Sequence, residues 1–301
     1  MNVFSHAGGV LAVMAGGMTA HAMEEASPSV VFPQARVVSA SFTLRNTGDQ
    51  VLSNAQLWVY APIERTAYQR RRSLLSTHAY ETQTDDRGNT ILHFNISSLA
   101  PSATEVIGIS TLIGFRSEPL PEMSAEAQYL QAEPLVEIDA PEFQQQAPQF
   151  AGADVRQMAL AIYEWTSRHL PHRSYLRYDQ GALYALQTRE GDCSEHAYLF
   201  VALCRRHGIP ARVMGGYRSR HGGVLNPEQY HNWAEFHDGQ TWRLADPHAR
   251  LFDDQAASYV ALRIVGSRQS PVSPYAQFRG EGEGLQVTMN SPATGASAYD
   301  R

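Results

Sequence analysis

Gly-Asp-Cys-Ser-Glu-His, at residues 191–196, decides the fold of this chain, because it combines a helix start with a cysteine. Asp192 and Glu195 have the D-x-x-E spacing of a capping box, in which the two residues satisfy backbone N–H groups at the start of a helix. This spacing places Cys193 at the first helical position. A thiol there lies at the positive end of the helix dipole, which favours the thiolate. The stretch therefore predicts a helix that carries a nucleophile at its N-terminus.

The residues that follow predict a buried helix. Ala197 to Cys204 are eight apolar or aromatic residues in succession, so this helix would be apolar on every side. Gly208 and Pro210 then end it. Cys204 lies in the apolar body of the helix and is expected to be a small buried hydrophobe. Two cysteines so placed on one helix would lie about 16 Å apart, so we expect two free thiols.

Further along, a hairpin is predicted to bring a histidine beside an aspartate. The pair Asp238-Gly239 is a strong hairpin signal. His231 and Asp246 lie seven residues before Asp238 and seven after Gly239, so they should be near cross-strand neighbours. An aspartate there would accept the ring proton of the histidine and stabilise the imidazolium. The predicted strands are 211–217, 230–236 and 241–246.

Taken together, these motifs resemble the core of the transglutaminase-like superfamily. The resemblance covers roughly residues 150–265 and implies a papain-like α+β fold with a Cys-His-Asp catalytic triad. The three residues of this triad correspond to Cys193, His231 and Asp246. Asn232 stands where the family commonly has a small residue, which implies an altered substrate groove. The motifs are GDCSEHA at 191–197, LFVAL at 199–203, GIPARV at 208–213, YHNWAE at 230–235 and ADP at 245–247.

The chemistry that the resemblance implies is acyl transfer through a thioester on Cys193. The substrate would be a protein or peptide that presents a peptide or glutamine-type amide, and an amine would be the acceptor. Two alternatives stay open: a cysteine protease, peptidase or amidase that only hydrolyses, and a non-catalytic binding or assembly module. An oxyanion hole is required, with the backbone N–H of Cys193 as one donor. Candidates for the second donor are Trp165, Tyr184 and Gln187.

Outside this core, the sequence predicts a β-sandwich. Short strands separated by polar turns between residues 36 and 115 are typical of an antiparallel sandwich, and the triplet 70–72, all arginine, is expected in one of its solvated loops. The fold class is therefore α+β, an N-terminal antiparallel β-sandwich followed by a papain-like, transglutaminase-like core. We divide the chain into a signal peptide (1–22), a β-sandwich domain (23–117), a linker with a short helix (118–150), a catalytic domain (151–265) and a flexible C-terminal tail (266–301).

Composition excludes several classes of protein. The chain has 301 residues and a formal net charge of −6, which argues against a basic nucleic-acid platform. All 24 residues in the Lys+Arg count are arginine, so Schiff-base and P-loop lysines are excluded. The twelve histidines match no metal-binding spacing, so we expect neither a metal nor a cofactor.

The N-terminal segment predicts export. Residues 8–22 are small and mostly apolar, and they end in Ala-His-Ala, a small-x-small cleavage pattern. The segment is too short to span a bilayer as a helix. We therefore expect a periplasmic or secreted protein without a membrane span, with a cytoplasmic protein as the alternative.

Overall fold

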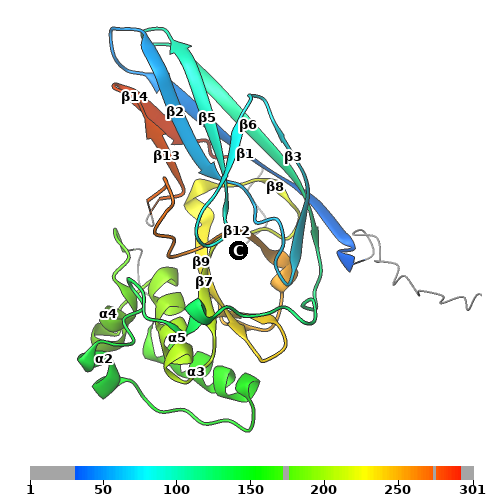
Figure 1. Ribbon diagram of the computed structural model, residues 1–301, viewed down its shortest axis with the longest axis vertical. Helices are drawn as coiled ribbons and strands as arrows, with labels where there is room; N and C mark the ends of the chain where they lie inside the picture. The colour runs from blue at the N-terminus through cyan, green and yellow to red at the C-terminus, as the bar shows by residue number, and fades with distance from the viewer. Residues whose placement is uncertain (1–30, 172–175, 274–275, 293–301) are drawn as a thin grey trace, which may run out of the picture.

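The computed structural model describes residues 31–171, 176–273 and 276–292. The signal peptide expected at 1–22 lies outside these residues. Figure 1 shows a β-sandwich at one end of the molecule, the helices α2 to α5 at the other end and a third sheet between them. In the described part of the chain, no helix is both long and apolar enough to cross a membrane.

The sandwich consists of two antiparallel sheets around one apolar core. Alternate residues of the long strands point inward, and Leu44, Leu57, Phe94 and Ile107 are fully buried between the sheets. The first sheet has the order β14 (Leu285–Met289), β1 (Gln34–Asn46), β6 (Thr104–Phe115) and β3 (Gln69–Ser76), with β8 (Gly223–Val224) parallel to β1. The second has the order β13 (Phe278–Glu281), β2 (Leu52–Tyr60), β5 (Thr90–Leu99) and β4 (Glu81–Thr84).

The expectation of a flexible tail at 266–301 is wrong for its middle part. Strand β13 pairs with β2, and β14 pairs with β1, so the two strands extend both sheets of the sandwich. The physical reason is burial: Phe278, Leu285 and Val287 pack against the sandwich core. Gly280 permits this packing, since a Cβ there would lie 2.4 Å from Val287.

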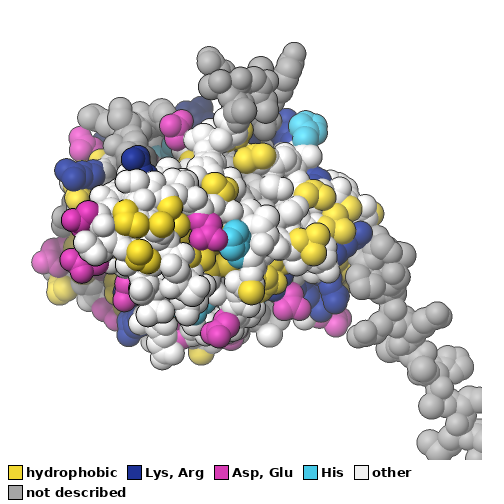
Figure 2. Space-filling model, turned by 90° about the horizontal axis from the view of Figure 1, so that it is seen from above, with side chains coloured by type: hydrophobic (Ala, Val, Ile, Leu, Met, Phe, Trp, Pro, Cys, Tyr) yellow, Lys and Arg dark blue, Asp and Glu magenta, His cyan; other side chains and the backbone are white. Residues whose placement is uncertain are grey.

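The arginine triplet at 70–72 does not lie in a loop, as the sequence suggested, but in the edge strand β3. Arg71 donates to the carbonyl of Pro62, and Arg72 donates to the carbonyl of Phe32. Long charged side chains suit an edge strand, because they discourage pairing with another chain while the strand keeps one hydrogen-bonded neighbour. On the face seen from above in Figure 2, arginine and acidic side chains lie close to one another.

The third sheet carries the motifs of the predicted core. Its order is β11 (Leu251–Phe252), β10 (Trp242–Asp246), β9 (Tyr230–His237), β7 (Ala211–Arg218) and β12 (Tyr259–Ile264), all antiparallel. One face packs against α5 (Cys193–Arg206), which is flanked by α3 (Val155–His169) and α4 (Gly181–Thr188). Short elements complete the chain: η1 (Ala127–Leu130), α2 (Pro141–Gln146), η2 (Pro227–Gln229) and η3 (Ala256–Ser258).

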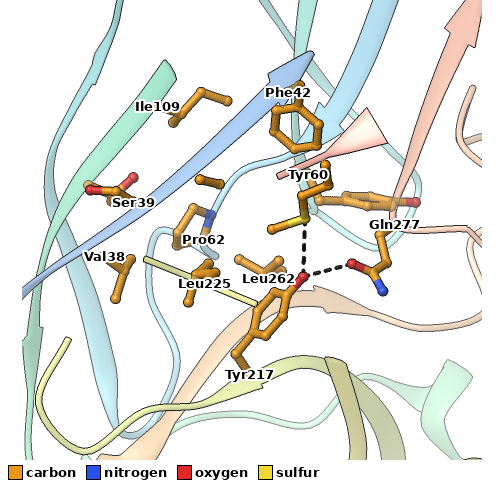
Figure 3. Close-up of a pocket in the computed structure, with 13 residues that line it drawn as sticks. Val38, Ser39, Phe42, Tyr60, Pro62, Ile109, Tyr217, Leu225, Leu262 and Gln277 are labelled. Carbon is orange, nitrogen blue, oxygen red and sulfur yellow. Dashed lines mark hydrogen bonds between the residues drawn. The ribbon is translucent and has the colours of Figure 1, made fainter. Parts of the chain in front are cut away.

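The sandwich and the third sheet share packing residues. Tyr217 on β7, with Val260 and Leu262 on β12, belongs to the same apolar cluster as the sandwich core. A small cavity of about 30 Å³ remains at this junction, and Figure 3 shows the Tyr217 hydroxyl at its edge, donating to Gln277 and facing the sulfur of Met289. The junction is therefore closely packed, which fixes the third sheet against the sandwich.

Candidate active site

Cys193 occupies the first position of α5, as the capping-box spacing predicted. The Asp192 side chain accepts from the backbone N–H of Ser194 at 2.9 Å, and the Glu195 side chain accepts from the N–H of Asp192 at 3.1 Å. Cys193 is half-buried, and both cysteines are free thiols. Cys204 is fully buried, and burial raises the pKa of its thiol well above the ordinary value. The two thiols thus have the contrasting surroundings that the sequence indicated.

His231 and Asp246 lie together on one face of the third sheet. Nε2 of His231 is 2.6 Å from Oδ2 of Asp246, whose carboxyl group is fully buried. The predicted hairpin register is off by two residues, because Ala245 pairs with Ala234 across a four-residue turn. A shift of two residues keeps each side chain on its own face, whereas a shift of one would have separated the pair.

The Cys193 side chain lies close enough to the His231 ring to affect its protonation, while Asp246 occupies Nε2 of the same ring. Burial opposes protonation of His231, but the charge and hydrogen bond of Asp246, together with Cys193, raise its pKa to about 10. The imidazolium is therefore the favoured form of His231 at neutral pH.

Asp246 is held by three donors, two of which the sequence did not reveal. Besides His231, the hydroxyl of Tyr259 donates to Oδ2 at 2.6 Å, and the backbone N–H of Ala249 donates to Oδ1 at 2.9 Å. Burial alone would raise the pKa of Asp246, but the charge and hydrogen bond of His231 and the other donors lower it. Asp246 is consequently a carboxylate that is fixed at both oxygens.

Two further histidines lie near this group. The ring of His248 is 5.7 Å from that of His231 and 5.2 Å from that of His196. His196 is buried, with its ring nitrogens 2.7 Å and 3.1 Å from the carbonyl oxygens of Asp192 and Leu170. Burial lowers the pKa of His196, although the two carbonyls act in the opposite direction, and the ring lies between the start of α5 and the end of α3.

A polar network joins the residues that follow two of the predicted site residues, Cys193 and His231. Asn232, next to His231, donates to the hydroxyl of Ser194, next to Cys193, at 2.9 Å. Ser194 in turn bonds to Asp179, which also accepts from the hydroxyl of Tyr198 at 3.0 Å. Asn232 therefore has a positional role here, linking β9 to the first turn of α5.

The three candidates for a second oxyanion donor are engaged elsewhere or exposed. Trp165 stacks on His169 at 4.2 Å between ring centroids, and the hydroxyl of Tyr184 donates to Glu190. Gln187 is exposed on α4. Within the described ranges, no group of three or more His, Cys, Asp or Glu side chains is arranged to hold a metal ion.

Comparison with known proteins identifies the part of the chain that holds these residues. Residues 143–247 match the family described as the transglutaminase-like superfamily, and this range contains Cys193, His231 and Asp246. A protein-glutamine gamma-glutamyltransferase of Pseudomonas aeruginosa is 30% identical over 111 residues. That stretch is 32% of this chain but 16% of the relative, so the relative is far longer than the shared region.

Solved structures resemble the chain over a wider range. A protein from Cytophaga hutchinsonii, named as a candidate cysteine protease, has a TM-score of 0.53 at 18% identity and covers 87% of this chain and 94% of its own. The periplasmic domain of TgpA from Pseudomonas aeruginosa has a TM-score of 0.31 at 22% identity and covers 73% and 92%. The first likeness supports the α+β fold with a sandwich before the core. Residues 143–247 are thus similar to the transglutaminase-like superfamily, and the likeness over the wider range is one of fold.

Proposed function

We propose that this protein is an acyltransferase that forms a thioester between Cys193 and the acyl group of a glutamine-type amide in a protein or peptide. One observation carries the proposal: a half-buried thiol at a helix N-terminus lies close to a histidine whose Nε2 is bonded to a buried aspartate. This arrangement supplies a nucleophile, a proton carrier and a group that orients the carrier.

In the first half of the reaction, the sulfur of Cys193 attacks the amide carbon, and the carbonyl oxygen takes up the negative charge. The backbone N–H of Cys193 points from the helix start, where such groups stabilise an oxyanion. As the carbon–nitrogen bond breaks, the imidazolium of His231 gives its proton to the leaving ammonia or amine. The products of this half are the thioester and a neutral His231.

In the second half, a primary amine attacks the thioester carbon. His231 takes a proton from the attacking nitrogen, and the carbon–sulfur bond breaks. The acyl group is released as the new amide, and the Cys193 sulfur is freed. Asp246 stabilises the imidazolium that is restored in this step. If water attacks instead, the same residues complete a hydrolysis, and the product is a carboxylate.

The relative from Pseudomonas aeruginosa favours transfer over hydrolysis, because its name specifies a gamma-glutamyl transfer from protein glutamine. The test is incubation of the protein with a glutamine-containing protein and a fluorescent primary amine. We expect covalent incorporation of the amine into the substrate. Release of ammonia or of new N-termini without incorporation would replace the transferase with a hydrolase. No turnover of any kind, together with His231-independent labelling of Cys193, would favour a binding module.

The composition of the chain makes the result of this test easier to interpret. Because the chain has no lysine, it cannot crosslink itself through glutamine–lysine bonds, so any such bond must take its lysine from another protein. The matched controls are Cys193→Ala, which should abolish incorporation, and Cys204→Ala, which removes the buried thiol instead.

We also propose that the protein acts outside the cytoplasm, since residues 8–22 have the pattern of an export signal. N-terminal sequencing of the protein from the producing cell tests this. A mature chain that begins after Ala22 is expected, and an intact N-terminus in the cytoplasmic fraction would contradict export.

A further inference from the structure

Tyr259 is a buried residue beside Asp246 that takes no part in the proposed reaction steps. It begins β12, where it pairs with Arg218 of β7, and only 4% of its surface is exposed. Its ring packs on Trp233, with 4.9 Å between centroids, and the Arg218 guanidinium lies 5.5 Å from its centroid. The position of the ring is thus set by packing, independently of its hydroxyl group.

The hydroxyl of Tyr259 donates to the same carboxylate oxygen as His231. Both distances to Oδ2 of Asp246 are 2.6 Å, whereas Oδ1 accepts only the backbone N–H of Ala249 among the described contacts. Two donors on one oxygen divide its negative charge, so each donor weakens the bond that the other can make. Tyr259 therefore affects how strongly Asp246 can hold a proton on His231.

We propose that Tyr259 is a positioning residue that holds Asp246 and limits the basicity that its carboxylate presents to His231. The inference rests on the proposed function, in which His231 must release its proton to a leaving amine and recover one from the acceptor. An Asp246 that held the imidazolium too strongly would make His231 a weak acid and would slow the first half of the reaction.

Tyr259 remains a donor over the working pH range. Its pKa is raised, first by burial and then by the charge of Asp246, so the phenol keeps its proton. The other titratable or charged groups close to Asp246 and Tyr259 come from four elements and one turn. They are Tyr163 of α3, Cys193 and His196 of α5, His231 of β9, Arg218 of β7, and His248 and Arg250 of the turn after β10.

The test is Tyr259→Phe, which removes the hydroxyl and leaves the ring. Ala249 still fixes Oδ1, so Asp246 should stay in place. Without the phenol, the carboxylate is less well stabilised once His231 loses its proton, and the proton on His231 is therefore held more tightly. A hydrogen bond to a charged group changes such an equilibrium by about tenfold, so the His231 titration should move up by about one pH unit.

Two measurements report this change. One is NMR titration of the labelled His231 ring, whose midpoint should rise in Tyr259→Phe. The other is the pH profile of amine incorporation: kcat should fall about tenfold at neutral pH, with KM nearly unchanged. The alkaline limb of the profile should shift to higher pH because His231 holds its proton more tightly. The acid limb should shift in the same direction because the more basic Asp246 carboxylate is protonated more readily.

Tyr217→Phe is the matched control. Tyr217 is also a buried tyrosine of the third sheet, but its hydroxyl bonds to Gln277 at the sandwich junction (Figure 3). A loss of rate without any shift in the two midpoints would give Tyr259 a merely structural role. The same shift in both variants would also overturn the inference. The NMR midpoint requires no substrate. A shift without any amine incorporation would therefore refute the proposed function but leave intact the inference that Tyr259 acts on Asp246.

Discussion

At the scale of single residues, the two cysteines offer the sharpest contrast. Cys193→Ala is expected to abolish incorporation without loss of stability, because its half-buried thiol contributes little packing. Cys204→Ala should keep the activity and cost about 1 kcal/mol in the free energy of unfolding, since it leaves a small void in a fully buried position. Urea unfolding and the amine assay measure the two effects. Activity retained in Cys193→Ala would remove the thioester from the mechanism.

The pair His231–Asp246 predicts a pH-dependent stability. The folded pKa of His231, about 10, lies above its ordinary value of 6.5, so the pair stabilises the fold fully below pH 6.5 and this stabilisation is lost as the pH rises through 10. Asp246→Asn breaks a buried pair and should cost on the order of 3 kcal/mol at pH 6. The difference from the natural protein should shrink toward pH 10. Urea unfolding across this range measures it, and a constant difference would contradict the ion pair.

Sequence reasoning could predict the positions of Cys193, His231 and Asp246 because each follows a local rule. The capping box fixed the first, and the parity of a hairpin kept the other two on one face despite a register error of two residues. Tyr259 follows no such rule. It stands thirteen residues after Asp246, at the start of an apolar strand, and only the three-dimensional path of the chain brings its hydroxyl to the carboxylate.

At the scale of elements, the start of α5 holds Cys193 of the candidate site in position. The side chain of Asp192 serves two purposes: Oδ1 accepts from the N–H of Ser194 inside the helix, and Oδ2 accepts from the N–H of Leu176 in the preceding segment. Glu195 likewise accepts from Gln180 as well as from Asp192. These carboxylates join the helix start to residues 176–180, and burial, aided by the charge of Asp192, raises the pKa of Glu195 to about 7.

Asp192→Ala should therefore destabilise the protein by about 1–2 kcal/mol, the usual cost of losing a helix cap. Asp192→Asn should cost less, because asparagine is as good a cap and retains one acceptor oxygen. Asp154→Ala provides a comparison, since Asp154 caps α3 by the same contact, with Gln157, away from the α5 cap. Urea unfolding compares the three. Equal losses in the two Asp192 variants would show that the charge, and not the cap, matters.

At the scale of the whole molecule, the C-terminal strands show why composition misled the prediction. Strands β13 and β14 have four and five residues, and Gly280, Gly282 and Gly284 lie in or between them. So short and glycine-rich a stretch is typical of a linker. Its partners, β2 and β1, lie more than two hundred residues earlier in the chain. Pairing between strands so far apart cannot be predicted from local sequence patterns.

The sandwich, the linker and the core are also joined by a buried ion network. Glu133 of the linker pairs with Arg87, in the turn between β4 and β5, and with Arg205 of α5 at 2.7 Å. Arg87 also donates to the carbonyl of Gly266, after β12. Since the side chains of all three ionic partners are at most 8% exposed, their charges depend on one another for stabilisation.

Glu133→Ala should leave two buried arginines without their shared partner and lower the free energy of unfolding by about 3–5 kcal/mol. Because the network spans both halves of the molecule, we expect one unfolding transition for the natural protein and two for the variant. Scanning calorimetry measures both effects. The control is Glu281→Ala, which breaks the exposed pair with Arg279 and should change stability by less than about 1 kcal/mol. If Glu133→Ala cost no more than this control, the halves would be held together by apolar packing at the junction alone.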